Sequence, residues 1–312
     1  MTILVCGSVA FDTIMVFQGQ FKQHILPEQI RILNVSFPVP EMRREFGGCA
    51  GNIAYSLALL GGQARILATV GEDAGPYLSR LDDFGIDRRF VRIVPGTFTA
   101  QAFITTDLDG NQIAAFHPGA MSQSHTNRAA DAESDVSWGI VSPDGREGML
   151  QHARDLHAAG IPFVFDPGQA LPILSGEDLL ACIDIATLCT ANDYEATLIC
   201  NKTGLSLDEL ANRLDGLIVT YGADGSRLFR HGESVEIPAA RPDYVVDPTG
   251  CGDAYRAGLL FGLSREWDLV KSARLASVMG AIKIGHQGAQ SHAPDREEIA
   301  RRFSDAYGDK LW

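Results

Sequence analysis

The stretch DPTGCGDAYRAG, at residues 247–258, places small residues and acids immediately before an apolar helical run. Gly250, Cys251 and Gly252 carry no bulky side chain, so successive backbone N–H groups can converge on one point. A helix that begins in this turn adds the partial positive charge of its N-terminus. Asp253 falls in the first helical turn. The stretch predicts an anion hole with a carboxylate beside it, although a glycine turn with an Asp that only caps the helix has the same pattern.

A second glycine turn precedes a helix near residue 50. Gly47 and Gly48 allow a ligand to approach the backbone, and Asn52 offers a donor and an acceptor to neighbouring hydroxyl groups. Asp12 follows the first expected strand at its carboxyl end, where open α/β sheets place ligands. The plainer alternatives are a turn with a helix cap at Gly48 and a capped lid turn at Asp12.

Two further segments offer ligand contacts. In TANDYEA, Asn192 and Glu195 are three residues apart and share one face if a helix begins there. This spacing suits Mg²⁺, which keeps much of its water shell and meets few carboxylates. A helix cap with a solvated Glu is the alternative. In AAFHPGAM, the ring of Phe116 either stacks on a purine over a sugar pocket or lies in the core beneath a lid.

Short β-branched runs alternate with helical patterns along the chain. We expect buried strands at 3–7, 64–71, 138–143, 161–167, 185–192 and 216–222. We expect helices at 52–60, 75–84, 146–159 and 206–214, and two long ones from Gly252 and Trp267. Strand, helix and strand in series require right-handed crossovers and a sheet covered on both faces. The predicted fold class is α/β, with a doubly wound and mostly parallel sheet flanked by helices.

Two β-rich segments interrupt this rhythm. Residues 13–39 and 98–116 have no intervening helix, and the second turns at Asp109-Gly110-Asn111, which predicts a hairpin. Their strands must pair away from the parallel core, as a small β-sheet lid. A further, peripheral hairpin is expected at 226–238. We expect one domain over residues 1–312, with the lid formed by about 13–45 and 96–118.

Composition and charge limit the partners. Hydrophobic residues make up 46% and charged residues 21% of the 312 residues, which is typical of globular proteins. The 39 acids and 26 bases give a formal net charge of −13, which argues against nucleic acid as a partner. Six cysteines without a CxxC pair indicate free thiols in a reducing cytoplasm. No signal peptide or run of about 18 apolar residues is found, so we expect no membrane contact.

Familiar catalytic motifs of other classes are missing from the sequence. There is no GxxxxGK[ST] phosphate loop, no HExxH zinc motif and no GxSxG elbow. The turn after the first strand, GSVAFD, has one glycine where a dinucleotide-binding oxidoreductase needs three.

DPTGCGDAYRAG resembles the C-terminal signature of the ribokinase-like (PfkB) sugar and nucleoside kinases, a D-T-x-G-A-G-D-type segment, with Cys251 in place of the usual alanine. The G-G-x-x-x-N pattern at 47–52 is similar to the family's N-terminal signature, and N-x-x-E at 192–195 to its metal and phosphate motif. The resemblance implies that Asp253 takes the proton of a substrate hydroxyl. It also implies that the amides of residues 250–252 stabilise charge on the γ-phosphoryl group.

The resemblance further implies the ligand contacts. Asp12, Gly48 and Asn52 would bind the sugar, with Gly47 beside them. The residues assigned to ATP are Asn192, Thr220, Gly222, Gly225 and Gly288. Mg²⁺ would lie near Asn192 and Glu195 and contact them through water. A monovalent cation is a further expected cofactor. Gly168 stands where many relatives have an Asn and offers no side chain for a phosphate contact.

The segment around Phe116 looks like the nucleoside-kinase branch of this family, which includes adenosine-kinase-like enzymes. We therefore predict ATP-dependent phosphorylation of the 5′-hydroxyl group of a nucleoside. A sugar kinase acting on ribose or fructose is the alternative. A non-catalytic sugar-binding regulator is a third hypothesis, and it would not need Asp253. The expected partners are ATP and a small nucleoside or sugar, and the expected assembly is a monomer or a homodimer.

Overall fold

The first strand, β1 (Thr2–Cys6), is buried along its whole length. Ile3 and Val5 belong to one hydrophobic cluster of the core, and Leu4 and Cys6 belong to a second. Successive side chains of a strand point to opposite faces of its sheet. The sheet around β1 therefore has a buried layer on each side.

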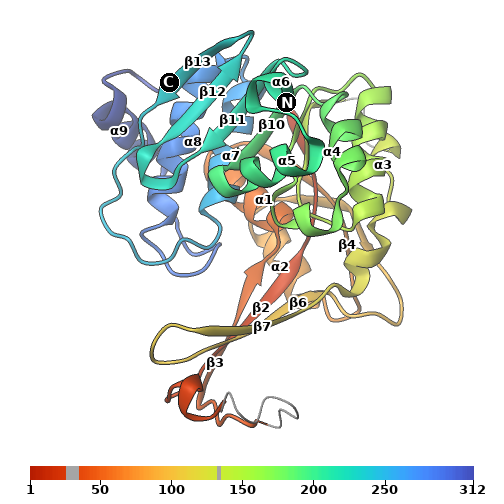
Figure 1. The fold of residues 1–312 in the computed structure, drawn as a ribbon, viewed down its shortest axis with the longest axis vertical. Helices are drawn as coiled ribbons and strands as arrows, with labels where there is room; N and C mark the ends of the chain where they lie inside the picture. Colours follow the sequence, from red (N-terminus) through yellow and green to blue (C-terminus); the bar gives the residue numbers. More distant parts are fainter. Residues whose placement is uncertain (26–34, 132–134) are drawn as a thin grey trace.

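The computed structural model, which describes residues 1–25, 35–131 and 135–312, places β1 inside a nine-stranded sheet (Figure 1). The strand order is β13-β12-β11-β10-β9-β8-β1-β4-β5. The other strands are β4 (Gln63–Val70), β5 (Asp87–Ile93), β8 (Val136–Val141), β9 (Phe163–Phe165), β10 (Leu188–Asn192), β11 (Gly216–Thr220), β12 (Ser226–Arg230) and β13 (Glu233–Ile237). Neighbours from β5 to β11 are parallel, whereas β12 and β13 are antiparallel. Because β4 and β8 flank β1, the strand order reverses there, which is where open α/β sheets bind ligands.

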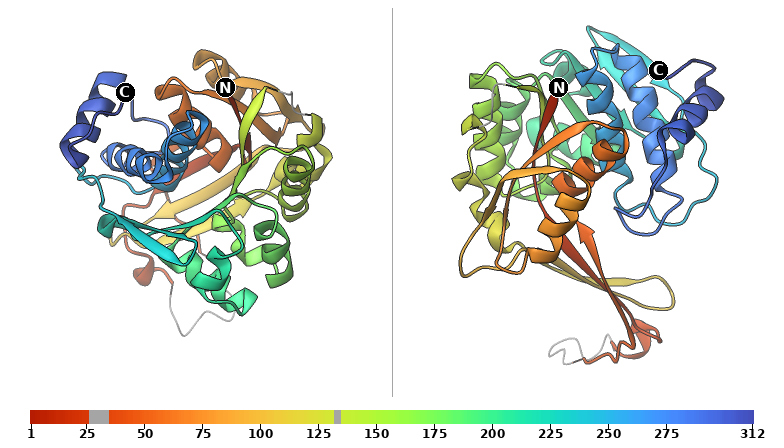
Figure 2. Two further views of the ribbon diagram at one scale, coloured as in Figure 1. Left: turned by 90° about the horizontal axis from the view of Figure 1, so that it is seen from above. Right: turned by 180° about the vertical axis from the view of Figure 1, so that it is seen from behind.

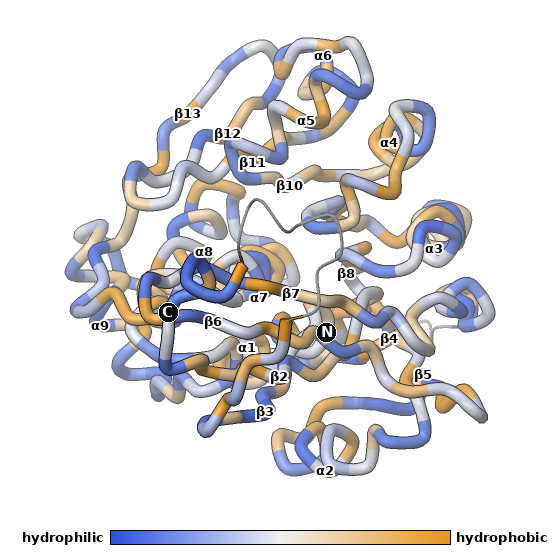
Figure 3. The backbone as a smooth tube through the Cα atoms, turned by 60° about the horizontal axis from the view of Figure 1, so that its bottom comes forward, coloured by the Kyte–Doolittle hydropathy of each residue, from blue (hydrophilic) through white to orange (hydrophobic). Residues whose placement is uncertain are grey.

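Helices cover both faces of this sheet (Figure 2). They are α1 (Cys49–Leu59), α2 (Gly75–Asp83), α3 (Arg146–Ala158), α4 (Gly176–Ile183), α5 (Asp193–Thr203), α6 (Leu207–Ala211), α7 (Cys251–Ser264), α8 (Leu269–Lys283) and α9 (Arg296–Tyr307). Residues of α1, α2, α7, α8 and α9 enter one hydrophobic cluster, and residues of α3 to α6 enter the other. In Figure 3 the outer helices α3 and α4 change between orange and blue around their turns, as expected for helices that bury one side.

A separate four-stranded sheet projects from this body (Figures 1 and 2). Its order is β3-β2-β6-β7, formed by β2 (Ala10–Val16), β3 (Glu41–Gly47), β6 (Ala100–Thr106) and β7 (Gln112–His117). We call it the lid sheet. Every residue of β7 is exposed. The sequence-based assignment of the whole chain to one domain with a lid stays a prediction.

The predicted fold class is confirmed, and so are the six expected strands of the large sheet. Helices also begin within three residues of each predicted start. The hairpin predicted at 98–116 is β6 and β7, with Gly110 N–H bonded to the Asp107 carbonyl in its turn. The hairpin at 226–238 is β12 and β13, but it continues the large sheet because β12 pairs with β11.

The prediction for residues 13–39 is partly wrong. The antiparallel partner of β2 is β3, at Glu41–Gly47, which lies after the predicted segment. Residues 35–39 form no strand, and residues 26–34 lie outside the described part of the chain. β3 has mostly polar, exposed side chains, so its sequence lacks the apolar signal of a buried strand. Helices α4, α5 and α9 and the strand β5 also went unpredicted.

Two further features concern the whole described fold. Within the described ranges, no helix has both the length and the apolar character needed to cross a bilayer. All six cysteines are free thiols, and three of them, Cys6, Cys182 and Cys189, are buried.

The contact between α7 and α8 gives a test of the packing. A Cβ on Gly258 would lie 2.7 Å from Ala276 Cα and 2.9 Å from the Leu275 carbonyl oxygen. Because both neighbours are backbone, we expect Gly258→Ala to lower the free energy of unfolding by about 1–3 kcal/mol. The control is Gly280→Ala in α8, where the nearest atom, Cys251 O, would be 3.6 Å away. Urea unfolding of both variants measures the effect, and equal stability of Gly258→Ala and the unmodified protein would contradict this packing.

Candidate active site

Two helices begin in glycine turns at the carboxyl edge of the large sheet. Gly48 precedes α1 with φ +83°, and a Cβ there would lie 2.6 Å from Ala10 N and Ser8 O. Gly250 precedes α7 with φ +78°, and its Cβ would lie 2.7 Å from Ala289 Cβ. Side chains are excluded at both positions by conformation and by space. The backbone of each helix start is therefore open to a ligand.

The first turn of α7 has free donors, as an anion hole requires. The N–H groups of Gly250 and Gly252 have no acceptor in the described part of the chain. The N–H of Cys251 differs from the prediction for this turn, because it donates to the Pro248 carbonyl oxygen at 3.1 Å. Anion binding by Cys251 would require that bond to be shared or broken.

A chain of side-chain hydrogen bonds joins the two turns. Asn52 Nδ2 donates to Asp253 Oδ2 at 2.8 Å, and Gln290 Nε2 donates to Asn52 Oδ1 at 2.9 Å. Gln290 Nε2 also donates to the Tyr77 hydroxyl at 2.7 Å, which in turn donates to the Gly47 carbonyl at 2.7 Å. Because the amide nitrogen of Gln290 faces Asn52 Oδ1, the Asn52 amide must turn its nitrogen toward the acid. No sequence pattern pointed to Gln290 or Tyr77, because their hydrogen-bond partners are distant in the chain.

The two candidate carboxyl groups have unusual acidities. Burial raises the pKa of Asp253 to about 6, against the opposing effects of the Asn52 hydrogen bond and of nearby Arg256. Burial also raises the pKa of Asp12 to about 6, with a smaller contribution from Glu45, its partner across β2 and β3. Asp12 accepts no hydrogen bond from the described residues. A half-buried carboxylate without a donor is suited to binding the hydroxyl groups of a ligand.

The Asp12 carboxylate lies directly against Gly47. A Cβ on Gly47 would approach Asp12 Oδ2 to 2.4 Å. The Gly47 carbonyl also receives the Tyr77 hydroxyl, so Asp12 stands at one end of the chain that leads to Asp253. The structure thus brings together the residues that the sequence assigns to a sugar and the acid assigned to catalysis.

Asn192 and Glu195 cap the start of α5. Asn192 Oδ1 accepts from Glu195 N–H and Glu195 Oε2 accepts from Asn192 N–H, both at 2.8 Å. The capping alternative is therefore right, but the Glu is not solvated, since its side chain is 15% exposed. Burial and the charge of Asp166 raise its pKa. Its Oε1 has no hydrogen-bond donor among the described residues and can face the water shell of Mg²⁺, which fits a contact through water. No group of three or more His, Cys, Asp or Glu that could hold a metal directly occurs in the described ranges.

The remaining candidates lie around the same edge. Thr220 pairs with Asn192 at the ends of β11 and β10. Gly222 and Gly225 form the turn after β11 with φ +58° and +93°. Gly288 has φ +72°, and its N–H donates to Asp247 Oδ2 at 2.8 Å. No hydrogen bond between described side chains links these residues to Asp253.

Phe116 lies on the lid sheet with 56% of its surface exposed, so the interpretation as a core residue is wrong. Phe116 pairs with Ala102, Ala102 with Asp12, and Asp12 with Glu45. Side chains directly opposite one another share a face of the sheet. Phe116 therefore lies on the same face as Asp12, two strands away.

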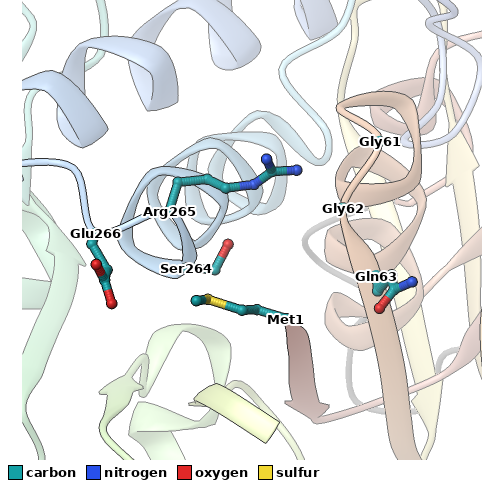
Figure 4. A pocket seen from close by; sticks show the side chains of 7 residues that line it. All are labelled: Met1, Gly61, Gly62, Gln63, Ser264, Arg265 and Glu266. Atoms are coloured by element: carbon teal, nitrogen blue, oxygen red, sulfur yellow. The ribbon is translucent and has the colours of Figure 1, made fainter. Parts of the chain in front are cut away.

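A pocket also occurs at the opposite edge of the large sheet (Figure 4). Its lining includes Met1, which precedes β1, Gln63, which begins β4, and Ser264, which ends α7. None of the predicted site residues contributes to it. The chemistry-bearing residues instead gather at the carboxyl ends of the strands, where this fold class binds ligands.

Comparison with known proteins agrees with this geometry. The family model for pfkB family carbohydrate kinases matches residues 11–296. The chain is 32% identical to a nucleoside kinase of Methanothermobacter thermautotrophicus, over 98% of this chain and 96% of that protein. It is 54% identical to the nucleoside kinase of Burkholderia thailandensis solved with inosine, with a TM-score of 0.89 and 99% of each chain covered. The structure of that kinase described with ADP-inosine gives a TM-score of 0.87 at 55% identity, over 99% of this chain and 97% of that one.

The acidity of Asp253 can be measured without any ligand. We expect its carboxyl group to titrate near pH 6, because burial disfavours the charged form. An infrared titration, taken as the difference between the unmodified protein and Asp253→Asn, isolates this group from Asp12. Asn52→Leu removes a hydrogen bond to the charged form and should move the midpoint to higher pH.

Asp12→Asn is the control, since Asp12 is not among the main causes of the pKa shift at Asp253. It should leave the midpoint of the Asp253 titration in place. A midpoint near the ordinary pKa of 3.8 would show that burial does not raise the pKa of Asp253. An unchanged midpoint in Asn52→Leu would show that Asn52 does not stabilise the charged form.

Proposed function

The chain belongs to the pfkB family of carbohydrate kinases, and from this premise we propose that it transfers the γ-phosphoryl group of ATP to the 5′-hydroxyl group of a nucleoside. The observation that carries the proposal is the hydrogen bond from Asn52 to Asp253, which holds an acid beside the free N–H groups of α7. The 54% identity to a kinase solved with inosine supports a nucleoside rather than a simple sugar.

In the proposed reaction, Asp253 accepts the proton of the 5′-hydroxyl group. The hydroxyl oxygen forms a bond to the γ-phosphorus while the bond from that phosphorus to the bridging oxygen breaks, and ADP leaves. The free N–H groups of Gly250 and Gly252 donate to the phosphoryl oxygens, where charge accumulates. Asn52 keeps the Asp253 carboxylate oriented toward the substrate, since its amide cannot rotate without losing Gln290.

The lid sheet and the body would each bind one part of the nucleoside. Asp12, Gly47, Gly48 and Asn52 would hold the ribose hydroxyl groups. Phe116 would cover the base, because it stands on the same face as Asp12 and about 10 Å away across two strands. That separation is comparable to the reach from a ribose to the far side of a base.

The opposite side of the site would hold ATP. The proposed contacts are Asn192, Thr220, Gly222, Gly225 and Gly288. Mg²⁺ held through water by Glu195 and Asn192 would neutralise charge on the phosphates. The monovalent cation, the cytoplasmic location and the assembly as monomer or homodimer stay predictions.

Replacement of the acid separates catalysis from binding. We expect Asp253→Asn to lower kcat by orders of magnitude and to leave nucleoside affinity nearly intact, because an amide oxygen can still accept from Asn52. ADP release in a coupled assay and calorimetry with inosine measure the two effects. Asp12→Asn should do the reverse and mainly weaken nucleoside binding. Near-normal turnover of Asp253→Asn would exclude the assigned role.

The pH dependence follows from the same group. Because the base must be deprotonated and burial raises its pKa to about 6, kcat/KM should fall as the pH drops through about 6. A pH series of initial rates with inosine and ATP measures this limb. A limb that stays near pH 4 would indicate that a carboxyl group of ordinary acidity acts as the base.

Replacement of the lid aromatic tests the substrate class. Phe116→Ala should raise KM for nucleosides much more than KM for ribose, since a free sugar leaves the ring little to cover. Phe103→Ala is the matched control, because Phe103 is also exposed on the lid sheet but follows Ala102 and so points to the other face. Equal effects of Phe116→Ala on ribose and nucleosides would favour the sugar kinase.

A further inference from the structure

Arg256 lies one helical turn after Gly252 and folds back over it. A Cβ on Gly252 would lie 2.8 Å from Arg256 Nη1 and 3.6 Å from Cζ. Long side chains of a helix lean toward its N-terminus, so this direction is the ordinary one. The result is that a guanidinium group sits beside the helix start whose N–H groups are free. A side chain at position 252 would force the guanidinium group to move.

The guanidinium group is held in place by an acid from another part of the chain. Nε and Nη2 of Arg256 donate to the two carboxylate oxygens of Asp166 at 2.8 and 3.0 Å. The side chains of Arg256 and Asp166 are 8% and 4% exposed. Glu195 Oε2 is 4.0 Å from Nη2. A two-point contact of this kind fixes the plane of the guanidinium as well as its position.

The third nitrogen, Nη1, is not used by this pair. It has no hydrogen-bond acceptor in the described part of the chain, although it is the nitrogen nearest to Gly252. Nη1 itself is not fully buried, since the neighbouring Gly252 is exposed, so this charged donor is open to a partner that comes from solution. A ligand bound at the start of α7 would supply the acceptor that Nη1 lacks.

We propose that Arg256 is a further catalytic residue whose Nη1 donates to an oxygen of the transferring phosphoryl group, beside the N–H of Gly252. This inference rests on the proposed kinase function and adds a permanent positive charge to its anion hole. Arginine is suited to this task because it stays charged and binds phosphoryl oxygens in a fixed geometry. Asp166 is then a positioning residue that holds the guanidinium plane.

The competing explanation is that Arg256 only neutralises buried acids. It stands among Asp166, Glu195 and Asp253, and each of these carboxylates raises the pKa of its guanidinium group. Removing one partner of a buried pair leaves an uncompensated charge, so a loss of activity in a single variant would not distinguish the two roles. A charge-balanced double variant does so.

The experiment compares Arg256→Met with the double variant Arg256→Met/Asp166→Leu. The double variant removes both charges and is expected to regain the stability that the single variant loses. We expect kcat with ATP and inosine to fall at least about 100-fold in both, as for loss of a donor that stabilises transition-state charge. Arg256→Lys keeps the charge and should recover part of this loss. Recovery of more than half of the original kcat by the double variant would overturn the proposal.

Arg65→Met is the control for loss of a buried arginine. The Arg65 side chain is 4% exposed and is paired with Asp87 and Asp135 near the start of β4, at the opposite edge of the sheet. This variant should lower the temperature of unfolding, because it loses a buried ion pair. Its kcat should stay within about twofold of that of the unmodified protein, because the folded molecules keep an intact site. A similar loss of kcat in Arg65→Met would show that the effect at Arg256 is not local.

A binding measurement separates this proposal from the proposed function. Calorimetry measures the affinity for Mg-ADP with inosine, in the presence and absence of aluminium fluoride, which imitates the phosphoryl group in transfer. Arg256→Met/Asp166→Leu should lose the gain in affinity that aluminium fluoride gives and keep the affinity for Mg-ADP. An unchanged gain would overturn the role of Arg256. If the unmodified protein binds aluminium fluoride with Mg-ADP but phosphorylates no nucleoside, the proposed nucleoside substrate is wrong. The effect of Arg256→Met/Asp166→Leu on the gain in affinity from aluminium fluoride still tests the role of Arg256.

Discussion

The site depends on one hydrogen bond, from Asn52 to Asp253, which joins the starts of two helices 201 residues apart in the chain. It forms because α1 and α7 lie on the same face of the large sheet and both begin at its carboxyl edge. The bond gives the half-buried acid a fixed donor, and the Gln290 amide fixes the orientation of that donor. A carboxylate that is held this way can be removed from water and still accept a proton in a defined direction. Without the bond, the two glycine turns would be separate ligand sites with no common chemistry.

Burial of so many polar groups is costly, and the rest of the fold has to support it. Asp253 and Asp12 both have a pKa raised to about 6, which means that burial makes their charged forms less favourable than those of exposed carboxyl groups. The pair of Arg256 and Asp166 adds two buried charges, and buried pairs seldom stabilise a fold. The two hydrophobic clusters that sandwich the sheet offset this cost, because they bury many apolar side chains completely.

Local pattern predicted much of this fold and part of the site. The apolar runs of the central strands and the glycine turns at Gly48 and Gly250 are visible in the sequence because each is a short-range requirement of the backbone. The strand β3 was missed because its side chains face solvent, and β-pairing rather than burial defines it. Gln290 was missed for another reason. Its partners Asn52 and Tyr77 are 238 and 213 residues away, and only the packed fold brings them together.

The separation between lid sheet and body has a consequence for specificity. The row Glu45, Asp12, Ala102 and Phe116 runs across all four strands of the lid sheet and presents one face to a ligand. The proposed phosphoryl transfer takes place in the body, at the start of α7. Asp12 touches Gly47, where the lid sheet meets α1, and so links the row to Asn52 and Asp253. Of this row, Asp12 lies nearest to the hydrogen bonds that reach Asp253. Substitutions at Ala102 or Phe116 should therefore leave those hydrogen bonds unchanged. A fold arranged in this way can alter the base that it accepts while the proton acceptor stays where it is.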